Sequence, residues 1–516
     1  MKTLDAAVAA MPWWQRRWCF LSLVLLAAVP LLWPAIPPLT DLPGHIGGFR
    51  IMAEAGQGAL AQHYRVDWAP IGNLGVDALV LLLAPLLGLE PAAKLVVMAI
   101  PMLTVAAMLW LSREAHGKCQ PSVLFALPLA YAAPFQFGFV NFSLSVALAI
   151  AGLALWLRLA RQSRPWLRLV LFVPLAGLVW LCHSFGWAML GLFIAGAEWA
   201  IQRGTGQSRW RAGIHVVLMC APMMLPVLVL MAAGAHSSVG GTGDWLDLRL
   251  KLLWALSVLR ERWQLYDILM AGALFFLVAA AWRSPRFSFV PVLAMPAMCG
   301  TAAFLLLPAF LAGASYVDMR VLPATLALAL IAIRVEPGNV LVAKRLAMVG
   351  LSFFTIRVVT STVAFALFAQ GQVAASRGAE ALPLGTAVLV LVNEPAADNW
   401  DNPRLGHIAG LAVARRRVFT NEQWTLPGQQ LIRSRHPGAA PFEGDPSQLV
   451  YPKTVSGGTD FDRALATFDR HTFRFVWTIG FPAGRAHQSD LMPIWRDDHS
   501  ALYRVITPLL LPGTKR

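Results

Sequence analysis

The segment Thr40-Asp41-Leu42-Pro43-Gly44-His45 places a carboxylate and an imidazole directly after the first apolar run of the chain. A carboxylate at a membrane–water boundary stays ionised while neighbouring helices shield it, which suits a general base acting on a hydroxyl group. Asp is also a common helix N-cap, so the alternative is that Asp41 only caps the helix that follows. Asp41 is the first candidate catalytic residue.

Several basic side chains near the same predicted face are suited to bind a phosphate, namely His45, Arg50, Arg65 and Arg320. Arg320 stands just before an apolar run, in Tyr316-Val317-Asp318-Met319-Arg320, where a planar guanidinium would reach headgroup depth. Two alternatives remain for Arg320: a local pair with Asp318, or an arginine that snorkels to the membrane surface.

Three further polar residues interrupt apolar segments, namely Asp77, Asn141 and His183. A carboxylate facing lipid would be costly, so Asp77 is expected to face protein or an aqueous cleft, where it would serve as a second site carboxylate. Asn141 and His183 fall at the predicted outer ends of spans. They either line a cavity or form hydrogen bonds between helices.

Metal and nucleotide motifs are not evident in the sequence. The glycines of Gly240-Gly241-Thr242-Gly243 follow no strand and precede no Lys-Ser/Thr pair, so we expect a mobile loop over a cleft rather than a phosphate loop. The five cysteines form no CxxC pair, and none lies in the last 200 residues. No metal ligands are therefore assigned, and any cofactor stays unknown.

The elements that position these residues are membrane helices. Of the 516 residues, 57% are hydrophobic and only 13% charged, against a globular norm of roughly 25% charged. The apolar residues form blocks of about 17 to 25, the length that crosses roughly 30 Å of hydrocarbon. About eleven such blocks fall between residues 18 and 369. The net charge of +15 lies mainly between blocks, which indicates membrane topology rather than nucleic-acid binding.

Charge distribution sets the expected orientation. Arg16 and Arg17 precede an apolar run that reads as an uncleaved signal anchor, which places the N-terminus in the cytoplasm. The arginine-rich loops become cytoplasmic only if the block 71–88 lies on the outer surface instead of spanning. The loop 39–91 and the C-terminal portion are then periplasmic, in a bacterial inner membrane.

The C-terminal portion, 371–516, differs from the transmembrane domain, 1–370, in having normal polarity. Two strand-like runs, 387–393 and 473–480, predict a small α/β domain. Trp400, His407, Trp424 and the basic run Arg415-Arg416-Arg417 are of types that stack on sugars, but they are equally common on globular surfaces. No catalytic role is assigned to them.

The order of elements in the first 120 residues resembles the GT-C superfamily of polyprenyl-phosphate-dependent glycosyltransferases, which includes aminoarabinose transferases and protein O-mannosyltransferases. The resemblance rests on Asp41 after the first span, the amphipathic stretch from His45 to Leu60, the apolar run from Asn73, and the short basic loop at Arg113. It implies that Asp41 is the base, and that the partners are a polyprenyl-phosphate-linked sugar and membrane lipids. The loop lacks a DxD or ExD doublet, so metal use does not carry over.

The leading hypothesis is therefore a periplasmic-face glycosyltransferase acting on a lipid, glycan or protein acceptor. Two other classes stay open: a transporter or flippase of lipid-linked sugars, and a non-catalytic scaffold of envelope assembly. The odd number of predicted spans and the absence of two similar halves count against a transporter. The donor sugar, the acceptor and the oligomeric state do not follow from the sequence.

Overall fold

The structure is a computed structural model. It describes residues 11–234, 241–311, 313–393, 400–402, 404–425, 428–436, 460–482, 484–498 and 500–506. By its internal contacts the chain forms two compact units. The first consists of Met1–Ala35, Ala69–Leu79 and Lys94–Phe365, and the second of Ile36–Trp68, Val80–Ala93 and Ala366–Arg516. Segments from both ends of the sequence thus share the second unit.

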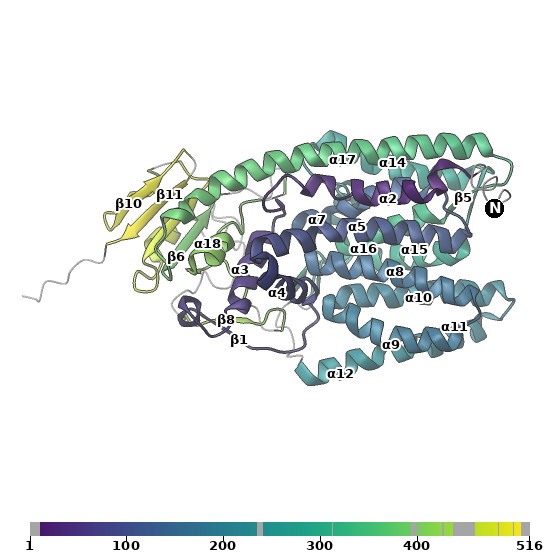
Figure 1. The fold of residues 1–516 in the computed structure, drawn as a ribbon, viewed down its shortest axis with the longest axis horizontal. Helices are drawn as coiled ribbons and strands as arrows, with labels where there is room; N and C mark the ends of the chain where they lie inside the picture. The colour runs from purple at the N-terminus through teal and green to yellow at the C-terminus, as the bar shows by residue number, and fades with distance from the viewer. Residues whose placement is uncertain are drawn as a thin grey trace, which may run out of the picture. The chain divides into compact units, whose positions relative to one another are not determined.

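The first unit is built mainly from helices, drawn as coiled ribbons in Figure 1. They are α2 (Arg17–Leu26), α6 (Val123–Ala126), α7 (Ala133–Phe137), α8 (Val140–Arg161), α9 (Pro165–Cys182), α10 (Ser184–Gly204), α11 (Arg209–Cys220), α12 (Leu225–Gly234), α13 (Leu248–Leu256), α14 (Gln264–Arg283), α15 (Pro291–Leu306) and α16 (Val317–Ala332). Three more helices have residues in both units: α4 (Gly75–Leu87), α5 (Leu89–His116) and α17 (Val340–Ser376). Short strands pair as β2 (Phe287–Phe289) with β5 (Ile333–Val335), and as β3 (Phe310–Leu311) with β4 (Ala314–Ser315).

The predicted membrane class is confirmed. Within the described residues, seven helical stretches are long and apolar enough to cross a membrane: Leu89–His116, Val140–Arg161, Pro165–Cys182, Ser184–Gly204, Arg209–Ala233, Gln264–Arg283 and Val340–Ala381. Shorter apolar helices occupy Arg17–Leu31, Gly75–Leu87, Val123–Phe137 and Pro291–Leu306. Every predicted span contains at least one helix, and α4, at 13 residues, is about 20 Å long and shorter than the hydrocarbon layer.

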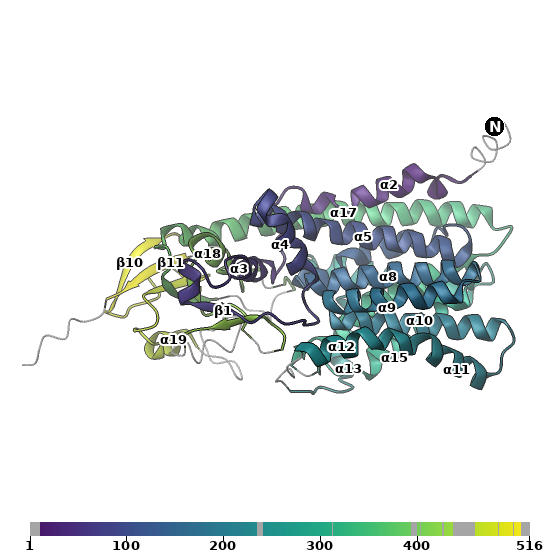
Figure 2. The same cartoon turned by 60° about the horizontal axis from the view of Figure 1, so that its bottom comes forward.

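One charged side chain inside the first unit, Arg168 of α9, is paired with a carboxylate. The helices α8, α9 and α10 lie side by side in Figures 1 and 2 and pack against each other. Between them, Arg168 donates to the buried Glu198 over 2.6 Å, and its guanidinium lies 4.7 Å from the ring centroid of Trp156. Because charges inside a membrane domain are costly unless paired, this contact explains how α9 tolerates an arginine.

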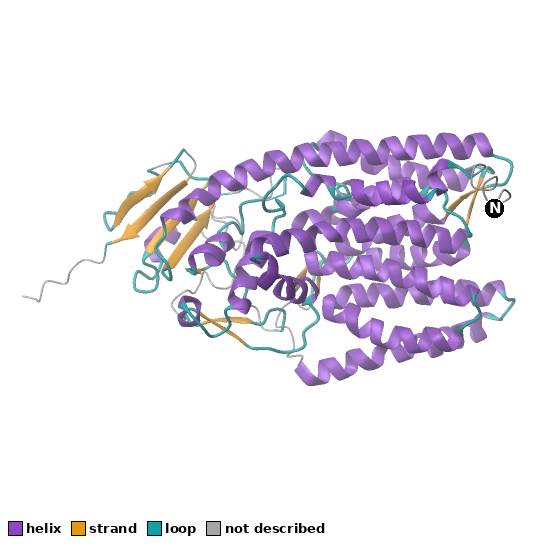
Figure 3. Ribbon diagram, in the orientation of Figure 1, coloured by secondary structure: helices purple, strands orange, loops and turns teal. Residues whose placement is uncertain are grey.

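The second unit contains the predicted α/β domain, whose main sheet appears as orange arrows in Figure 3. Its five strands are ordered β10 (Leu491–Arg496), β11 (Ser500–Val505), β9 (Phe475–Ile479), β6 (Ala387–Val392) and β7 (Phe419–Thr420). The two runs expected to be strands are β6 and β9, which pair in parallel with Val388 opposite Phe475. All six residues of β6 are buried, as an apolar run in a central parallel strand requires.

Residues of the early loop 36–68 complete the second unit. Strand β1 (Tyr64–Val66) pairs antiparallel with β8 (Ile432–Ser434), Tyr64 lying opposite Ser434. Helix α3 (Leu42–Ala53) packs against α18 (Gly410–Arg416), and α19 (Phe461–Thr467) is a further short helix of this unit. The segment that carries Asp41 is therefore built together with the C-terminal domain.

Candidate active site

Asp41 occupies the N-cap position of α3, but its side chain makes no capping hydrogen bond. The backbone carbonyl of Asp41 accepts from the backbone N–H of His45, so the helix starts without help from the carboxylate. The Asp41 side chain is 16% exposed. The alternative that Asp41 serves only as a helix cap finds no support in this geometry.

The residue facing the Asp41 carboxylate is His407, from the segment that leads into α18. The distance from His407 Nε2 to Asp41 Oδ1 is 3.7 Å, and the imidazole side chain is 8% exposed. The other ring nitrogen, Nδ1, is buried and makes no hydrogen bond within the described residues. An aspartate and a histidine that lie 366 positions apart are thus paired in one unit.

Trp424, from a third segment, packs against the rings of His407 and His45. Its ring centroid lies 4.5 Å from that of His407 and 5.0 Å from that of His45. Trp424 and His45 are both partly exposed, whereas His407 is buried. The arrangement offers an aromatic surface beside a carboxylate, a combination suited to a polar ligand with apolar faces.

Close packing of glycines brings α3 against α18. A Cβ atom on Gly410 would lie 2.2 Å from the carbonyl oxygen of Pro43, and one on Gly47 would lie 3.0 Å from the carbonyl oxygen of Gly410. A Cβ atom on Gly44 would lie 2.8 Å from the Trp424 ring. Any larger residue at Gly410 would force the two backbones apart, and His407 would move with them.

Burial sets the protonation of the imidazoles at this site. Burial, together with the neighbouring His45, lowers the pKa of His407 to about 3. Burial likewise lowers the pKa of His45 to about 4. Both rings are therefore neutral at pH 7, so each has one nitrogen that donates and one that accepts.

A buried carboxyl group, Glu422, lies behind α18. Burial raises the pKa of Glu422 well above its usual value. The backbone N–H groups of Ala409 and Gly410 lie close and offset part of this effect, although neither makes a hydrogen bond of ordinary geometry with the side chain. Glu422 is thus held in its neutral form over a wider pH range than a solvated glutamate.

The two arginines of the early loop are engaged in structural contacts. Arg50 donates to the carbonyl of Ala414 over 3.1 Å and to Glu54 over 3.2 Å, which ties α3 to α18. Arg65 is 59% exposed and lies 3.5 Å from Asp67. Both residues belong to the unit that contains Asp41, but the hydrogen bonds of Arg50 go to Ala414 of α18 and to Glu54.

In the first unit, Asp77 and Asn141 form a buried pair. Asn141 donates to Asp77 over 2.7 Å and accepts from the backbone N–H of Val76 over 2.6 Å. Asp77 is 7% exposed and faces protein, as the cost of facing lipid predicts. Asn141 therefore forms the interhelical hydrogen bonds that were one of its two expected roles.

Arg320 and His183 lie near each other in the same unit. The Arg320 guanidinium lies 4.1 Å from the ring centroid of Phe139, and Nη2 donates to the carbonyl of Ser315. His183 lies at the junction of α9 and α10, where burial and the Arg320 charge together lower its pKa to about 3. His183 Nδ1 accepts from the backbone N–H of Phe185, so the imidazole caps α10.

Asp318 is paired with a residue that the sequence did not suggest. Its Oδ2 accepts from Lys251 Nζ over 3.0 Å, and both side chains are buried. Lys251 belongs to α13, which follows the glycine-rich segment 240–243 that was expected to be a mobile loop. It also donates to the carbonyls of Phe304 and Leu307. Gly240 of the glycine-rich segment lies outside the described residues.

A small apolar cavity of about 40 Å³ lies beside Arg320. Its walls include Phe135, Phe142 and Ile150 from α7 and α8, and Arg320 contributes a positive charge to them. A cavity of this volume holds only a few water-sized groups, so it could take at most one end of a larger ligand.

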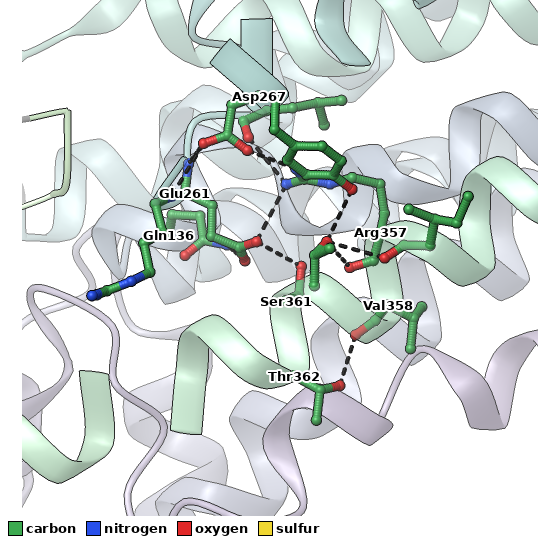
Figure 4. A network of polar contacts seen from close by, with 12 residues as sticks. Gln136, Glu261, Asp267, Arg357, Val358, Ser361 and Thr362 are labelled. Atoms are coloured by element: carbon green, nitrogen blue, oxygen red, sulfur yellow. Dashed lines mark hydrogen bonds and ion pairs between the residues drawn. The ribbon is translucent and has the colours of Figure 1, made fainter. Parts of the chain in front are cut away.

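Figure 4 shows a buried polar network that the sequence reasoning missed. Arg357 of α17 donates to Asp267 over 2.7 Å and lies 3.5 Å from Glu261, which also accepts from Gln136 and Ser361. Arg357 could have indicated this network, because a charged residue in the middle of a predicted span requires a buried partner. Two carboxylates share one guanidinium here.

Within the described residues, no three His, Cys, Asp or Glu side chains converge in a way that could hold a metal ion. Asp41 and His407 together supply two groups of the ligand type. The structure thus offers no assignable metal ligand set in its described part.

No family model matches the sequence, and no curated protein matches it. Two solved structures do, both of ArnT from Cupriavidus metallidurans. The apo form superposes with a TM-score of 0.53 at 13% identity, and the form bound to undecaprenyl phosphate with a TM-score of 0.50 at 14% identity. Each covers 94% of this chain and 97% of the other. This chain therefore shares the fold of ArnT over nearly its whole length.

Proposed function

We propose that this protein is an integral-membrane glycosyltransferase that moves a sugar from a polyprenyl-phosphate donor to a lipid, glycan or protein acceptor. The observation that carries the proposal is the Asp41 carboxylate, which stands at the start of α3 without capping it. The likeness in fold to a protein crystallised with undecaprenyl phosphate supports a lipid-linked donor.

In the proposed reaction, Asp41 accepts the proton of an acceptor hydroxyl as its oxygen attacks the anomeric carbon of the donor sugar. The bond between that carbon and the phosphate oxygen breaks, and polyprenyl phosphate leaves with the bonding electrons. Negative charge grows on the phosphate, so a guanidinium near it lowers the barrier. For the first unit, we separately propose Arg320 as a phosphate ligand, because its planar fork matches a phosphate and it borders an apolar cavity.

The remaining candidates take supporting roles in this proposal. His45 and Arg65 belong to the unit of Asp41 and would contact the acceptor or donor sugar. Asp77 and Asn141 hold α4 against α8, and His183 and Asp318 hold the elements on either side of Arg320. Arg50 would act on the site by fixing α3.

We further propose that the protein lies in a bacterial inner membrane with its C-terminal domain in the periplasm. Arg158, Arg161 and Arg164 gather at the end of α8 and before α9, which favours a cytoplasmic position for this loop. The N-terminus would then be cytoplasmic as well. Cysteine accessibility labelling at the α8–α9 loop and at exposed His471 in intact cells tests this orientation.

The function is tested by mass spectrometry of lipid and envelope-glycan extracts. Cells lacking the protein, cells with the native chain and cells with Asp41→Asn are compared. Loss of one sugar increment in both the deletion and the variant, with the lipid-linked sugar accumulating, is the expected result. Asp67→Asn is the matched control, because Asp67 is a half-exposed acid of the same loop.

Two outcomes would count against the proposal. If Asp41→Asn behaves as the native chain while the deletion alters the envelope, the protein acts as a transporter or a scaffold. If Asp41→Asn and Asp67→Asn lose function equally, the loop tolerates no change of charge and Asp41 has no special role.

A further inference from the structure

We propose that His407 of the C-terminal domain is a positioning residue for Asp41, so that the soluble domain forms part of the catalytic centre. This inference rests on the proposed glycosyltransferase function and assigns that site a second essential side chain. It concerns only contacts within the second unit.

The two segments that hold the pair run alongside each other. Arg404 Nη1 donates to the carbonyl of Pro38 over 2.6 Å at one end. At the other end, Gly410 packs against Pro43 with no room for a side chain. His407 lies midway between Arg404 and Gly410, as Asp41 lies between Pro38 and Pro43. Contacts on both sides therefore fix the spacing between His407 and Asp41.

The Arg404 end is itself anchored. The Arg404 guanidinium lies 4.3 Å from the ring centroid of Phe368, and its backbone carbonyl accepts from Gln372 over 2.8 Å. At the Gly410 end, the backbone N–H of Gly410 donates to the carbonyl of His407. His407 is thus held by its own backbone as well as by ring packing.

The tautomer of His407 follows from its surroundings. With the proton on Nε2, the ring directs an N–H at Asp41 Oδ1 and leaves Nδ1 as a buried acceptor. With the proton on Nδ1, the ring would bury a donor that has no partner within the described residues, and would turn a lone pair toward the carboxylate. Because buried unpaired donors are the rarer and costlier case, the Nε2–H form is favoured.

An N–H directed at Oδ1 fixes the orientation of the Asp41 carboxylate, the group that accepts the proton of the acceptor hydroxyl in the proposed reaction. The 3.7 Å separation is longer than a hydrogen bond, as is common in catalytic pairs before substrate binds. During the reaction the hydroxyl proton passes to Asp41, and His407 keeps its own proton throughout. Trp424, 4.5 Å from the His407 ring, limits rotation of the imidazole.

A purely structural histidine would show the same burial and the same contact with Trp424. The two roles differ in what a substitution does. A structural role is reported by the melting temperature, and a positioning role by kcat at unchanged KM. Gln separates them further, because its amide N–H reaches the place of Nε2–H while an Ala side chain supplies none.

The experiment measures sugar transfer by the full-length protein in detergent with a synthetic polyprenyl-phosphate sugar, together with its thermal unfolding. His407→Ala is expected to lower kcat roughly 10- to 100-fold, because the Asp41 carboxylate would no longer be held in its orientation. The KM for the donor and the KM for the acceptor should change little. His407→Gln is expected to recover most of the activity. His471→Gln, at an exposed histidine of the same domain, is expected to match the native chain.

In the Asp41→Asn background, His407→Ala is expected to cause no further loss, because His407 acts through Asp41. The inference is overturned if His407→Ala keeps native kcat, if His407→Gln folds but is no better than His407→Ala, or if neither variant folds. A native chain that transfers no sugar overturns the proposed function instead. The two failures are therefore distinguishable.

Discussion

Replacement of Gly410 by alanine tests the contact that brings α3 and α18 together. The added Cβ would lie 2.2 Å from the Pro43 carbonyl oxygen and 2.7 Å from the Gly44 Cα. Carbon and oxygen atoms normally approach to about 3.3 Å, so the two backbones must separate by about 1 Å. Overpacking of this kind typically costs about 1–3 kcal/mol of unfolding free energy.

The same displacement should reach the reaction centre. The backbone N–H of Gly410 is bonded to the carbonyl of His407, so a shift of α18 moves the imidazole relative to Asp41. A misplacement of about 1 Å can cost roughly 100-fold in rate. Gly410→Ala is therefore expected to lower both the melting temperature and kcat.

Gly371→Ala is the matched control. Gly371 lies inside α17 in the second unit, and a Cβ there would meet no atom within 4 Å. Alanine in a helix is favoured over glycine by up to about 1 kcal/mol, so this variant should be as stable as the native chain or more stable. The assays are thermal unfolding in detergent and steady-state sugar transfer. The reasoning is refuted if Gly410→Ala matches the native chain in both, or if Gly371→Ala loses as much.

Three further predictions concern charged groups. Arg357→Met leaves two buried carboxylates without their cation, so it should lower the free energy of unfolding by about 3–5 kcal/mol, as measured by thermal unfolding. Arg345→Met, at an exposed position of the same helix, should have little effect. Equal effects of the two substitutions would contradict the network. Arg320→Lys keeps the charge but loses the fork and its stacking on Phe139, so kcat/KM for the donor should fall roughly tenfold, and an unchanged value would remove Arg320 from the phosphate site. The pKa of Glu422 is raised in the folded state, so the stability that this group contributes is present below pH 4.5 and is lost as pH rises. Glu422→Gln should therefore become more stable relative to the native chain as pH rises above 4.5, as measured by denaturation at about pH 5, 6.5 and 8, and a constant difference would show that ionisation of Glu422 does not affect stability in this range.

Much of the fold was predictable because its driving force is composition. Apolar blocks long enough to cross a bilayer give helices whatever their neighbours are, and each predicted span contains a helix. The runs that became β6 and β9 were visible because fully buried parallel strands are continuously apolar. Strand β10 was missed, since its outward residues are exposed and give no such run.

Of the candidate site, only the part that one segment of the sequence supplies, Asp41, was predictable. Asp41 was identifiable because its segment follows the first apolar run. His407 and Trp424 were noted only as surface types, since nothing in the sequence shows that α18 packs on α3. The glycines at 44, 47 and 410 make that contact, but a glycine signals close approach only once its neighbour is known. The partners of Asp318 and Arg357 were hidden for the same reason.

The pairing of segment 404–410 with segment 38–43 also has a consequence for biosynthesis. Residues 36–68 leave the ribosome early, whereas their partners are made more than 300 residues later. At about 5–20 residues per second, the early loop waits roughly 20–70 seconds for the chain that covers it. During that interval Tyr64 and the apolar face of α3 have no permanent partner. A truncated chain would therefore carry Asp41 without His407 and would be inactive, so turnover would begin only when synthesis of the C-terminal domain is complete.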